Sequence, residues 1–387
     1  MKVLGVVLEL NPFHNGHKYF LSKAQEEIKP DITIAIMSGN FSMRGEVMVM
    51  DKWTRAQLLL QHNVDIVLEL PYLSTVNSAD YFSYNAINTL CQFRINNIAF
   101  GVELDDLYKL QKIKAIIDSD IYQESIKKYL SKGLSYSASS YKAIQEITNE
   151  EDIIKNCTLP NNTLAIGYLK AIEELNPIIN PTLIKRINNN YYDEDITHDK
   201  INSATALRRL IAEGIDISKY TPDINYNYFH PQKTNENLLF LLKYLFSVFK
   251  SKDFTNIYGV SEGIENRINS FIHDAQSFDD LIKNIKTKRY PPNRIKRLLL
   301  HILLQTPKEY ENKYHHYLRI LSMNEKGVNY LNSLPKEIKK QIITSFKNQD
   351  HYLVDMELKA SKLYSLLVGV PNLYLKEFNV PYLGGKQ

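Results

Sequence analysis

The sequence predicts an α/β protein that starts as a doubly wound parallel β-sheet and ends in a mostly helical region. Short apolar runs have the length and composition of strands that are covered on both faces. Helix-compatible stretches separate these runs, and this alternation favours parallel strands joined by crossover helices. The apolar runs are residues 3–8, 32–37, 64–70 and 98–100, and the helical stretches between them are 51–61 and 79–91.

The first strand leads into two histidines at the start of a helix. Residues 11–13 form the turn, and the residues after Gly16 are compatible with a helix. His14 and His17 have the i, i+3 spacing that puts two side chains on one helical face. Beside them lie the unpaired N–H groups and the positive dipole end of the helix, which suit an anion. The alternative is that both are ordinary, partly exposed polar residues.

Three loops follow the carboxyl ends of the predicted strands. They contain residues 10–11, 38–40 and Gly101. In doubly wound sheets, ligands bind beyond these ends. We therefore expect the three loops to converge on the place to which the histidines point.

Basic residues further along the chain supply candidate phosphate ligands. Arg44, Lys52 and Arg55 follow the second strand and can neutralise a triphosphate, although a solvated charged loop and helix face would use the same residues. For Lys52 the functional role is favoured. Ser203 precedes a helix that carries Arg208, so a hydroxyl, a helix N-terminus and a guanidinium can all face one phosphate.

Composition excludes several classes of protein. The 387 residues are enough for two domains, and a hydrophobic content of 44% supports packed cores. A net charge of +4 is too small to indicate nucleic-acid binding by the whole chain. Cys91 and Cys157 are too few for a disulfide framework or a four-cysteine zinc site. We find no signal peptide and no run of ~18 apolar residues, so we expect a soluble cytoplasmic protein without a membrane span.

The C-terminal half is expected to be a helical domain. Residues 220–233 resemble a linker, which divides the chain into domains at 1–220 and 234–387. Between 283 and 297, seven basic residues surround Tyr290. Basic side chains interleaved with an aromatic suit phosphate contacts and stacking on an unpaired base, as in RNA binding. The alternative is a solvated basic helix face.

Two motifs resemble those of a known superfamily. His-Asn-Gly-His at 14–17 resembles the HxGH signature of nucleotidylyltransferases and class I aminoacyl-tRNA synthetases, and 201–208 resembles their phosphate-binding IS(S/A)TxIR element. Asn202 and Leu207 depart from that pattern without removing a phosphate-binding group. The implied fold is a Rossmann-like sheet of the HxGH nucleotidylyltransferase type.

A longer series of segments resembles one family, the tRNA(Met) cytidine acetate ligases, over nearly the whole chain. In order, the segments are GVVLELNPFHNGHKYFL, MSGNFSMRGE, DKWTRAQLLL, DIVLELP, PNNTLAIGYLKAI, IKRI, INSATALR, VSEGIENRI and KTKRYPPNRIKRLLLHILL. The resemblance implies that ATP activates acetate to acetyladenylate. The acetyl group then passes to N4 of the wobble cytidine in elongator tRNA(Met), which becomes N4-acetylcytidine.

The resemblance also implies roles for individual residues. His14, His17 and Lys52 would be catalytic, and Lys288, Arg289, Arg294 and Arg297 would contact the tRNA. Magnesium is expected with the ATP, without a dedicated protein site for the metal. The expected ATP-binding residues are Val7, Leu8, Glu9, Leu10, Asn11, Pro12, Phe13, His14, Asn15, Gly16, His17, Lys18, Tyr19, Phe20, Gly101, Asn161, Arg186, Ser203 and Arg208.

Some expectations stay open at this point. The family usually has Gly-Ser-Glu where this chain has Gly101-Val102-Glu103, which puts a side-chain contact at position 102 in doubt. The asparagine pair 161–162 precedes an apolar-periodic stretch, as a helix N-cap would. Alternative functions are adenylyl transfer to a small phosphorylated substrate and non-catalytic binding of nucleotide or RNA. The long basic C-terminal region argues against the first, and the retained histidines, Ser203 and Arg208 argue against the second.

Overall fold

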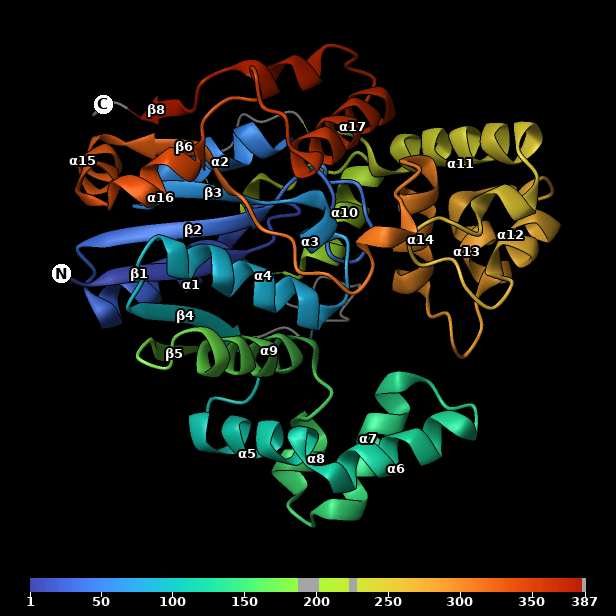
Figure 1. Cartoon of the computed structure of the whole chain (residues 1–387), viewed down its shortest axis with the longest axis horizontal. Helices are drawn as coiled ribbons and strands as arrows, with labels where there is room; N and C mark the ends of the chain where they lie inside the picture. The colour runs from blue at the N-terminus through green and yellow to red at the C-terminus, as the bar shows by residue number, and fades with distance from the viewer. Residues whose placement is uncertain (187–201, 223–227, 385–387) are drawn as a thin grey trace.

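The computed structural model describes residues 1–186, 202–222 and 228–384. In this part of the chain, eight strands form one sheet in the order β5-β4-β1-β2-β3-β6-β7, with β8 paired to β6 (Figure 1). The first five strands are parallel, and four of them match the apolar runs that the sequence predicts as parallel strands. The strands are β1 (Val3–Leu8), β2 (Ile32–Ser38), β3 (Ile66–Leu70), β4 (Asn97–Val102), β5 (Asn180–Lys185), β6 (Leu318–Asn324), β7 (Ile342–Ile343) and β8 (Tyr382–Gly384).

The C-terminal part of the chain returns to this sheet, which the sequence analysis did not predict. β6 pairs antiparallel with β3, and β7 and β8 both pair with β6. The sheet is therefore mixed. It does not follow the expected division at residues 220–233, because strands from both sides of that linker share one hydrogen-bonded ladder.

Helices cover both faces of the sheet, as in doubly wound folds. Leu4, Val6 and Leu8 of β1 pack in a core with α1 (Asn15–Ile28) and α2 (Lys52–Gln61). Val7 points to the opposite face, where α4 (Ala79–Gln92) and α9 (Pro160–Leu175) lie. At Gly167 of α9 a Cβ would stand 2.7 Å from Ser83 Oγ of α4, so glycine allows these two helices to approach closely.

Four helices between β4 and α9 form an arm that extends beyond the sheet (Figure 1). Leu110, Tyr122, Ala143 and Ile153 connect the arm to the core on the α9 side. The arm helices are α5 (Leu107–Asp118), α6 (Asp120–Ser131), α7 (Tyr136–Ile147) and α8 (Glu151–Asn156).

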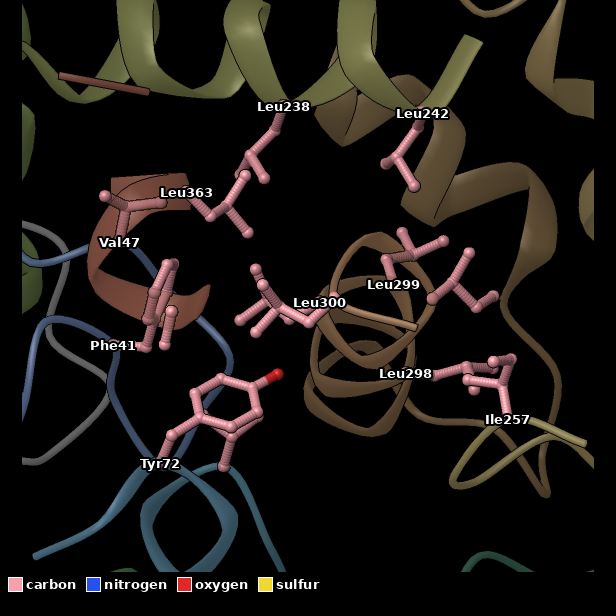
Figure 2. Close-up of a cluster of buried hydrophobic side chains, with 14 of the residues drawn as sticks. Phe41, Val47, Tyr72, Leu238, Leu242, Ile257, Leu298, Leu299, Leu300 and Leu363 are labelled. Carbon is pink, nitrogen blue, oxygen red and sulfur yellow. The ribbon is translucent and has the colours of Figure 1, made fainter. Parts of the chain in front are cut away.

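A second helical group lies after the linker, on the same side of the molecule as the C-terminal end of the sheet (Figure 1). It packs on the segment that follows β2. Figure 2 shows Phe41, Val47 and Tyr72 facing Leu300 of α14 and Leu363 of α17 within one buried cluster. The N-terminal half of the chain and the C-terminal helices therefore share a hydrophobic core.

The remaining helices complete these layers. They are α3 (Tyr72–Thr75), α10 (Ala204–Ala212), α11 (Pro231–Val248), α12 (Ile264–Ile272), α13 (Phe278–Ile285), α14 (Pro292–Leu303), α15 (Glu325–Ser333), α16 (Lys336–Gln341) and α17 (Tyr352–Leu367), with short 3₁₀ turns at Ser218–Tyr220, Ser251–Phe254, Lys308–Tyr310 and Leu373–Phe378.

Candidate active site

A pocket of about 210 Å³ opens at the carboxyl ends of β1, β4 and β5. All three loops that the sequence predicted to converge contribute to this region, the second of them through Met43, Arg44 and Glu46. Fourteen of the predicted ATP-binding residues line the pocket: Val7, Leu8, Glu9, Asn11, His14, Gly16, His17, Tyr19, Phe20, Gly101, Asn161, Arg186, Ser203 and Arg208.

Five residues of the predicted site do not line the pocket. Leu10 and Phe13 are buried in the core on the α1 side, where their side chains fix the turn rather than face a ligand. Pro12 is also buried, and Lys18 is exposed to solvent. The side-chain amide of Asn15 donates to the carbonyl of Lys219. These residues hold the segment 7–20 in shape, whereas their neighbours face the cavity.

The two histidines organise the start of α1. His14 is the N-cap, and its Nδ1 accepts a hydrogen bond from Gly16 N at 3.0 Å. His17 Nδ1 accepts from His14 N at 3.3 Å, and the ring centroids are 3.8 Å apart. Because Nδ1 is the acceptor in both rings, the hydrogen-bond pattern assigns the proton of each neutral ring to Nε2. Both rings line the pocket, and the ring of His17 also lies beside the backbone of Glu9.

Both rings are neutral at pH 7. Burial lowers the pKa of His14 well below its usual value, and the charges of His17, Arg186 and Arg208 add to this effect. Burial and Arg186 lower the pKa of His17 to about 3, against a smaller opposing effect of the Glu9 backbone. The histidines therefore act as neutral hydrogen-bond donors rather than as imidazolium cations.

This protonation state predicts a pH profile. The pH dependence of kcat/KM reports groups of the free enzyme. A histidine with an ordinary pKa would produce a limb near pH 6.5, whereas His17 stays neutral until the pH falls towards about 3. We expect kcat/KM for ATP to show no histidine limb between roughly pH 5.5 and 8. A limb in that range that disappears in His17→Asn would contradict the assignment.

A second helix start faces the histidines. Ser203 is the N-cap of α10, and its hydroxyl accepts from Ala206 N at 3.0 Å. Arg208 on the same helix donates to the carbonyl of Asn11 at 2.8 Å and pairs with Glu46 at 3.0 Å. The sequence indicated that a hydroxyl, a helix N-terminus and a guanidinium can lie at one place, and the structure brings the three together. This place is next to the turn at residues 11–13.

Glu46 is a pocket residue that the sequence analysis did not select. It pairs with Arg208 and, at 3.0 Å, with Lys296 of α14. Burial raises the pKa of Glu46, but Arg208, Lys296 and Arg44 outweigh it and lower the pKa to about 2. Its carboxylate therefore joins the phosphate side of the pocket to the basic C-terminal helix. A single acidic residue in a polar loop carries no sequence signal for such a role.

The end of β4 is held by the start of α9. Glu103 accepts hydrogen bonds from the backbone N–H groups of Asn161 and Asn162 and from the Asn161 side chain. The asparagine pair is therefore not the N-cap, because α9 begins at Pro160 and Glu103 supplies the acceptor. Val102 is fully buried in the core and does not line the pocket, whereas Gly101 does.

The structure places Lys52 away from the pocket, contrary to the catalytic role expected for it. Its ammonium is fully buried and pairs with the carboxylates of Glu69, Glu357 and Glu377. Arg55 is also buried and donates to backbone carbonyls, including that of Ser38 at 3.0 Å. Neither side chain can reach a triphosphate from these positions, so we no longer propose Lys52 as a catalytic group.

A second cavity of about 1100 Å³ lies between the arm and the C-terminal helices. Lys288, Arg289, Arg294 and Arg297, the four residues predicted to contact tRNA, all line it, and Tyr122 and Tyr136 of the arm line the opposite side. We call it the basic cleft. The sequence did not indicate the arm's contribution, because helices with mixed polar and apolar residues carry no specific signal.

Tyr290 does not stack on a base as its sequence context suggested. It is buried, and its hydroxyl bonds to Ser261 at 2.9 Å. The guanidinium of Arg294 covers its ring at 4.1 Å. Arg297 is also largely enclosed and donates to the carbonyl of Met43 at 3.1 Å, and burial lowers its pKa to about 10. Lys288, Arg289 and Arg294 are the exposed basic residues of the four.

The described residues contain no group of three or more histidine, cysteine, aspartate and glutamate side chains that could hold a metal ion. Among the described residues, the carboxylates that line the pocket are Glu9 and Glu46, and Glu46 is already paired with two cations. The described part of the pocket therefore does not fit a dedicated magnesium site. No helix in the described ranges has the length and apolar character needed to span a membrane.

A doubly wound sheet whose first strand leads into two histidines at a helix start, facing a Ser–Arg helix, defines a nucleotidyltransferase of the HIGH class. The family model described as HIGH Nucleotidyl Transferase matches residues 1–376. The relatives narrow the assignment. The tRNA(Met) cytidine acetate ligase of Staphylococcus aureus is 35% identical over 387 residues and covers 99% of both chains, and that of Oceanobacillus iheyensis is 37% identical over 385 residues and covers 95% of both.

Solved structures agree with this assignment. The crystal structure of Thermotoga maritima TmcAL in its apo form matches with a TM-score of 0.88 and 31% identity, over 99% of each chain. TmcAL bound with alpha-thio ATP matches with a TM-score of 0.85 and 30% identity, over 99% of this chain and 100% of that one. This chain belongs to the tRNA(Met) cytidine acetate ligase family.

Proposed function

We propose that this protein uses ATP to convert acetate to acetyladenylate and transfers the acetyl group to N4 of the wobble cytidine of elongator tRNA(Met). The observation that carries the proposal is the pair of neutral histidines at the start of α1, opposite Ser203 and Arg208 in one pocket. Full-length membership of the family supports it. The proposal includes a cytoplasmic location, which suits two cysteines without a disulfide.

Acetate is already an anion at pH 7, so the first step requires little acid–base chemistry. A carboxylate oxygen attacks the α-phosphorus, and the bond to pyrophosphate breaks. The Nε2–H groups of His14 and His17 donate to the oxygens on which charge grows, in a site that holds them fixed before the reaction. Ser203, Arg208 and Arg186 hold the remaining phosphates. Magnesium would arrive with the triphosphate, since the described residues offer it no carboxylate cluster in the pocket.

In the second step the exocyclic amine of cytidine attacks the acetyl carbonyl and AMP leaves. The wobble base must reach the nucleotide pocket while the rest of the anticodon arm is held outside it. We propose that the basic cleft holds the RNA, because its exposed cations suit phosphates and it is large enough for a folded-back loop. Arg297 and Met43 connect the two cavities through one hydrogen bond. ATP chemistry is thus proposed for residues 1–220 and RNA contact for 234–387.

A pyrophosphate-release assay tests the proposed function. The protein is incubated with ATP and either acetate or a phosphorylated nucleotide precursor, with and without elongator tRNA(Met). We expect acetate-dependent release of pyrophosphate and, with tRNA, the formation of N4-acetylcytidine. Release that depends on the phosphorylated substrate instead would indicate an adenylyltransferase. Binding of ATP without release of pyrophosphate under any of these conditions would indicate a non-catalytic module.

A variant of the basic cleft tests the RNA contact. Replacing Lys288, Arg289 and Arg294 by alanine should weaken tRNA binding, and the slope of log K against log salt should fall by about 2, at roughly 0.7 per lost contact to a single strand. Acetyladenylate formation without tRNA should persist, because none of the three side chains lines the nucleotide pocket. Filter binding across a salt series measures both affinity and slope.

The matched control removes three exposed lysines from a different surface. Lys336, Lys339 and Lys340 of α16 lie on the far side of the sheet from the cleft (Figure 1). Their replacement by alanine lowers the net charge equally but should leave the salt slope unchanged. Equal weakening by both triple variants would contradict a specific role of the cleft. Arg297 is left out because its hydrogen bond to Met43 reaches the nucleotide pocket.

A further inference from the structure

Helix α9 separates the two cavities and presents a different face to each. Asn161, Leu164 and Tyr168 line the nucleotide pocket at spacings of i, i+3 and i+7, which define one helical face. Ile166 and Lys170 face the basic cleft instead. Two residues of the first face, Leu164 and Tyr168, have large apolar surfaces. Phosphate binding beside the histidines does not require such surfaces.

The apolar lining of the pocket has two halves, on opposite sides of β1. On the α1 side, Leu8 and Phe20 belong to one core cluster. On the α4 and α9 side, Phe82, Phe100 and Tyr168 belong to the other, and Met43, Val7 and Leu164 pack against it. We call the second half the α9 compartment. Adenine has several edge atoms that form hydrogen bonds. The α1 side suits adenine better, because Gly16, Lys185 and Arg186 supply polar partners there. The α9 compartment suits a smaller, apolar group.

Tyr168 is the residue of the α9 compartment that carries a hydroxyl group. Tyr168 is only 5% exposed and lines the pocket. Burial and the nearby Glu9 carboxylate raise its pKa, so the hydroxyl keeps its proton and can donate. Because Tyr168 lines the pocket, its hydroxyl can donate a hydrogen bond to a ligand that binds there.

The charge beside Tyr168 is compatible with an anion. Glu9 Oε2 accepts from Met43 N at 2.6 Å and from Ser38 Oγ at 3.3 Å, which directs part of its charge into the protein. Burial raises the pKa of Glu9, and the positive charge of Arg44 acts against this rise. Arg44 lines the same pocket, where its charge acts on Glu9. A small carboxylate can therefore approach without meeting an uncompensated negative charge.

We propose that the α9 compartment binds the acyl group of a short monocarboxylate and thereby selects acetate. The Tyr168 hydroxyl donates to one carboxylate oxygen, which becomes the carbonyl oxygen of the acyl adenylate. The methyl group lies among Phe82, Phe100 and Leu164. The other carboxylate oxygen attacks the α-phosphorus beside the histidines and pyrophosphate leaves, with no proton transferred. This inference rests on the proposed function, because it assigns the binding site of the acetate in that reaction.

The first test removes the hydroxyl alone. In Tyr168→Phe we expect KM for acetate in ATP–pyrophosphate exchange to rise by about 10-fold or more, the scale for losing a hydrogen bond to a charged group. The dissociation constant for ATP without acetate should change by less than roughly threefold. The control is Tyr330→Phe. The hydroxyl of Tyr330 donates to the carbonyl of Phe93, and Tyr330 lines neither cavity.

The second test enlarges the compartment. One methylene in an apolar pocket changes kcat/KM by roughly 10- to 200-fold, so the wild-type protein should prefer acetate to propionate by that factor. Leu164→Ala should reduce this preference by at least about 10-fold, because it removes more volume than propionate adds. Leu164 is partly exposed and lies in the first half of α9, which favours a folded variant.

The outcomes separate the inference from the function on which it rests. Wild-type protein that exchanges pyrophosphate with no monocarboxylate would overturn the proposed function. Normal exchange with acetate, combined with an unchanged KM in Tyr168→Phe and an unchanged preference in Leu164→Ala, would overturn this inference alone. A weaker affinity for ATP in Tyr168→Phe, without a change in KM for acetate, would assign the compartment to adenine and also overturn it.

Discussion

Replacing His14 or His17 by asparagine should slow acetyladenylate formation by about two to three orders of magnitude, the usual cost of losing one fixed transition-state donor. Asparagine is a sharper probe than alanine because its carbonyl oxygen can take the place of Nδ1. It can therefore still accept the backbone hydrogen bond that each histidine accepts from Gly16 or His14. What it lacks is a donor at the position of Nε2. Pyrophosphate release with ATP and acetate measures the rate.

The alanine variants provide the comparison. His14 is the N-cap of α1, so His14→Ala should also cost roughly 1 kcal/mol of stability, as other lost caps do. His14→Asn should keep most of that stability, although its rate of acetyladenylate formation should fall as in the alanine variant. Should the asparagine variants release pyrophosphate at nearly the wild-type rate, the Nε2–H groups would have no part in the chemistry, and the histidines would serve only to cap the helix.

The parts of the site that the sequence predicted are those with local signals. An apolar run that ends in a turn and is followed by a helix start specifies where His14 and His17 lie, because strand, turn and helix are contiguous. The same holds for Ser203, which the structure confirms as the N-cap of α10. In a doubly wound sheet, strand order places these local units at one edge. The expected convergence of the loops followed from topology alone.

The parts that the sequence could not predict depend on contacts between distant residues. Tyr290 appeared to be a stacking residue, but it packs against Ser261 in the core of the C-terminal helices. The strand β6 lies between helical stretches and joins the sheet next to β3, which no short-range pattern requires. Glu46 gains its role from Arg208 and Lys296, which lie 162 and 250 residues further along the chain. Charge pattern alone cannot identify such partners.

The segment after β2 connects the two cavities. Met43 N donates to Glu9 in the nucleotide pocket, and Met43 O accepts from Arg297 at the basic cleft. At Gly45 a Cβ would stand 2.5 Å from Arg297 N, and the backbone there has φ +76°, so the close contact with α14 requires glycine. The residues 43–45 therefore contact both α14 and the wall of the nucleotide pocket.

Lys52→Met should lower the free energy of unfolding by about 3–5 kcal/mol, the range for breaking a buried ion pair. Lys52 pairs with Glu357 at 2.9 Å and with Glu377 at 2.6 Å, and it also pairs with Glu69. Methionine fills a similar volume but leaves three buried acidic side chains, with Arg319 and Arg55 as nearby cations. Urea denaturation of both proteins measures the loss.

This prediction separates a structural role for Lys52 from the catalytic role that its sequence context favoured. If the cluster only supports the fold, the folded variant should bind ATP with nearly the wild-type affinity, because Lys52 does not line the pocket. Adding Glu69→Gln to Lys52→Met should restore part of the stability, since it removes one of the unpaired charges, and the double-mutant cycle gives the coupling. Burial and the charge of Glu69 raise the pKa of Glu357, and the charge of Lys52 opposes this rise, so removing Lys52 favours the protonated form of this carboxyl. A Lys52→Met variant of normal stability whose rate of acetyladenylate formation falls 100-fold would restore Lys52 to the catalytic site.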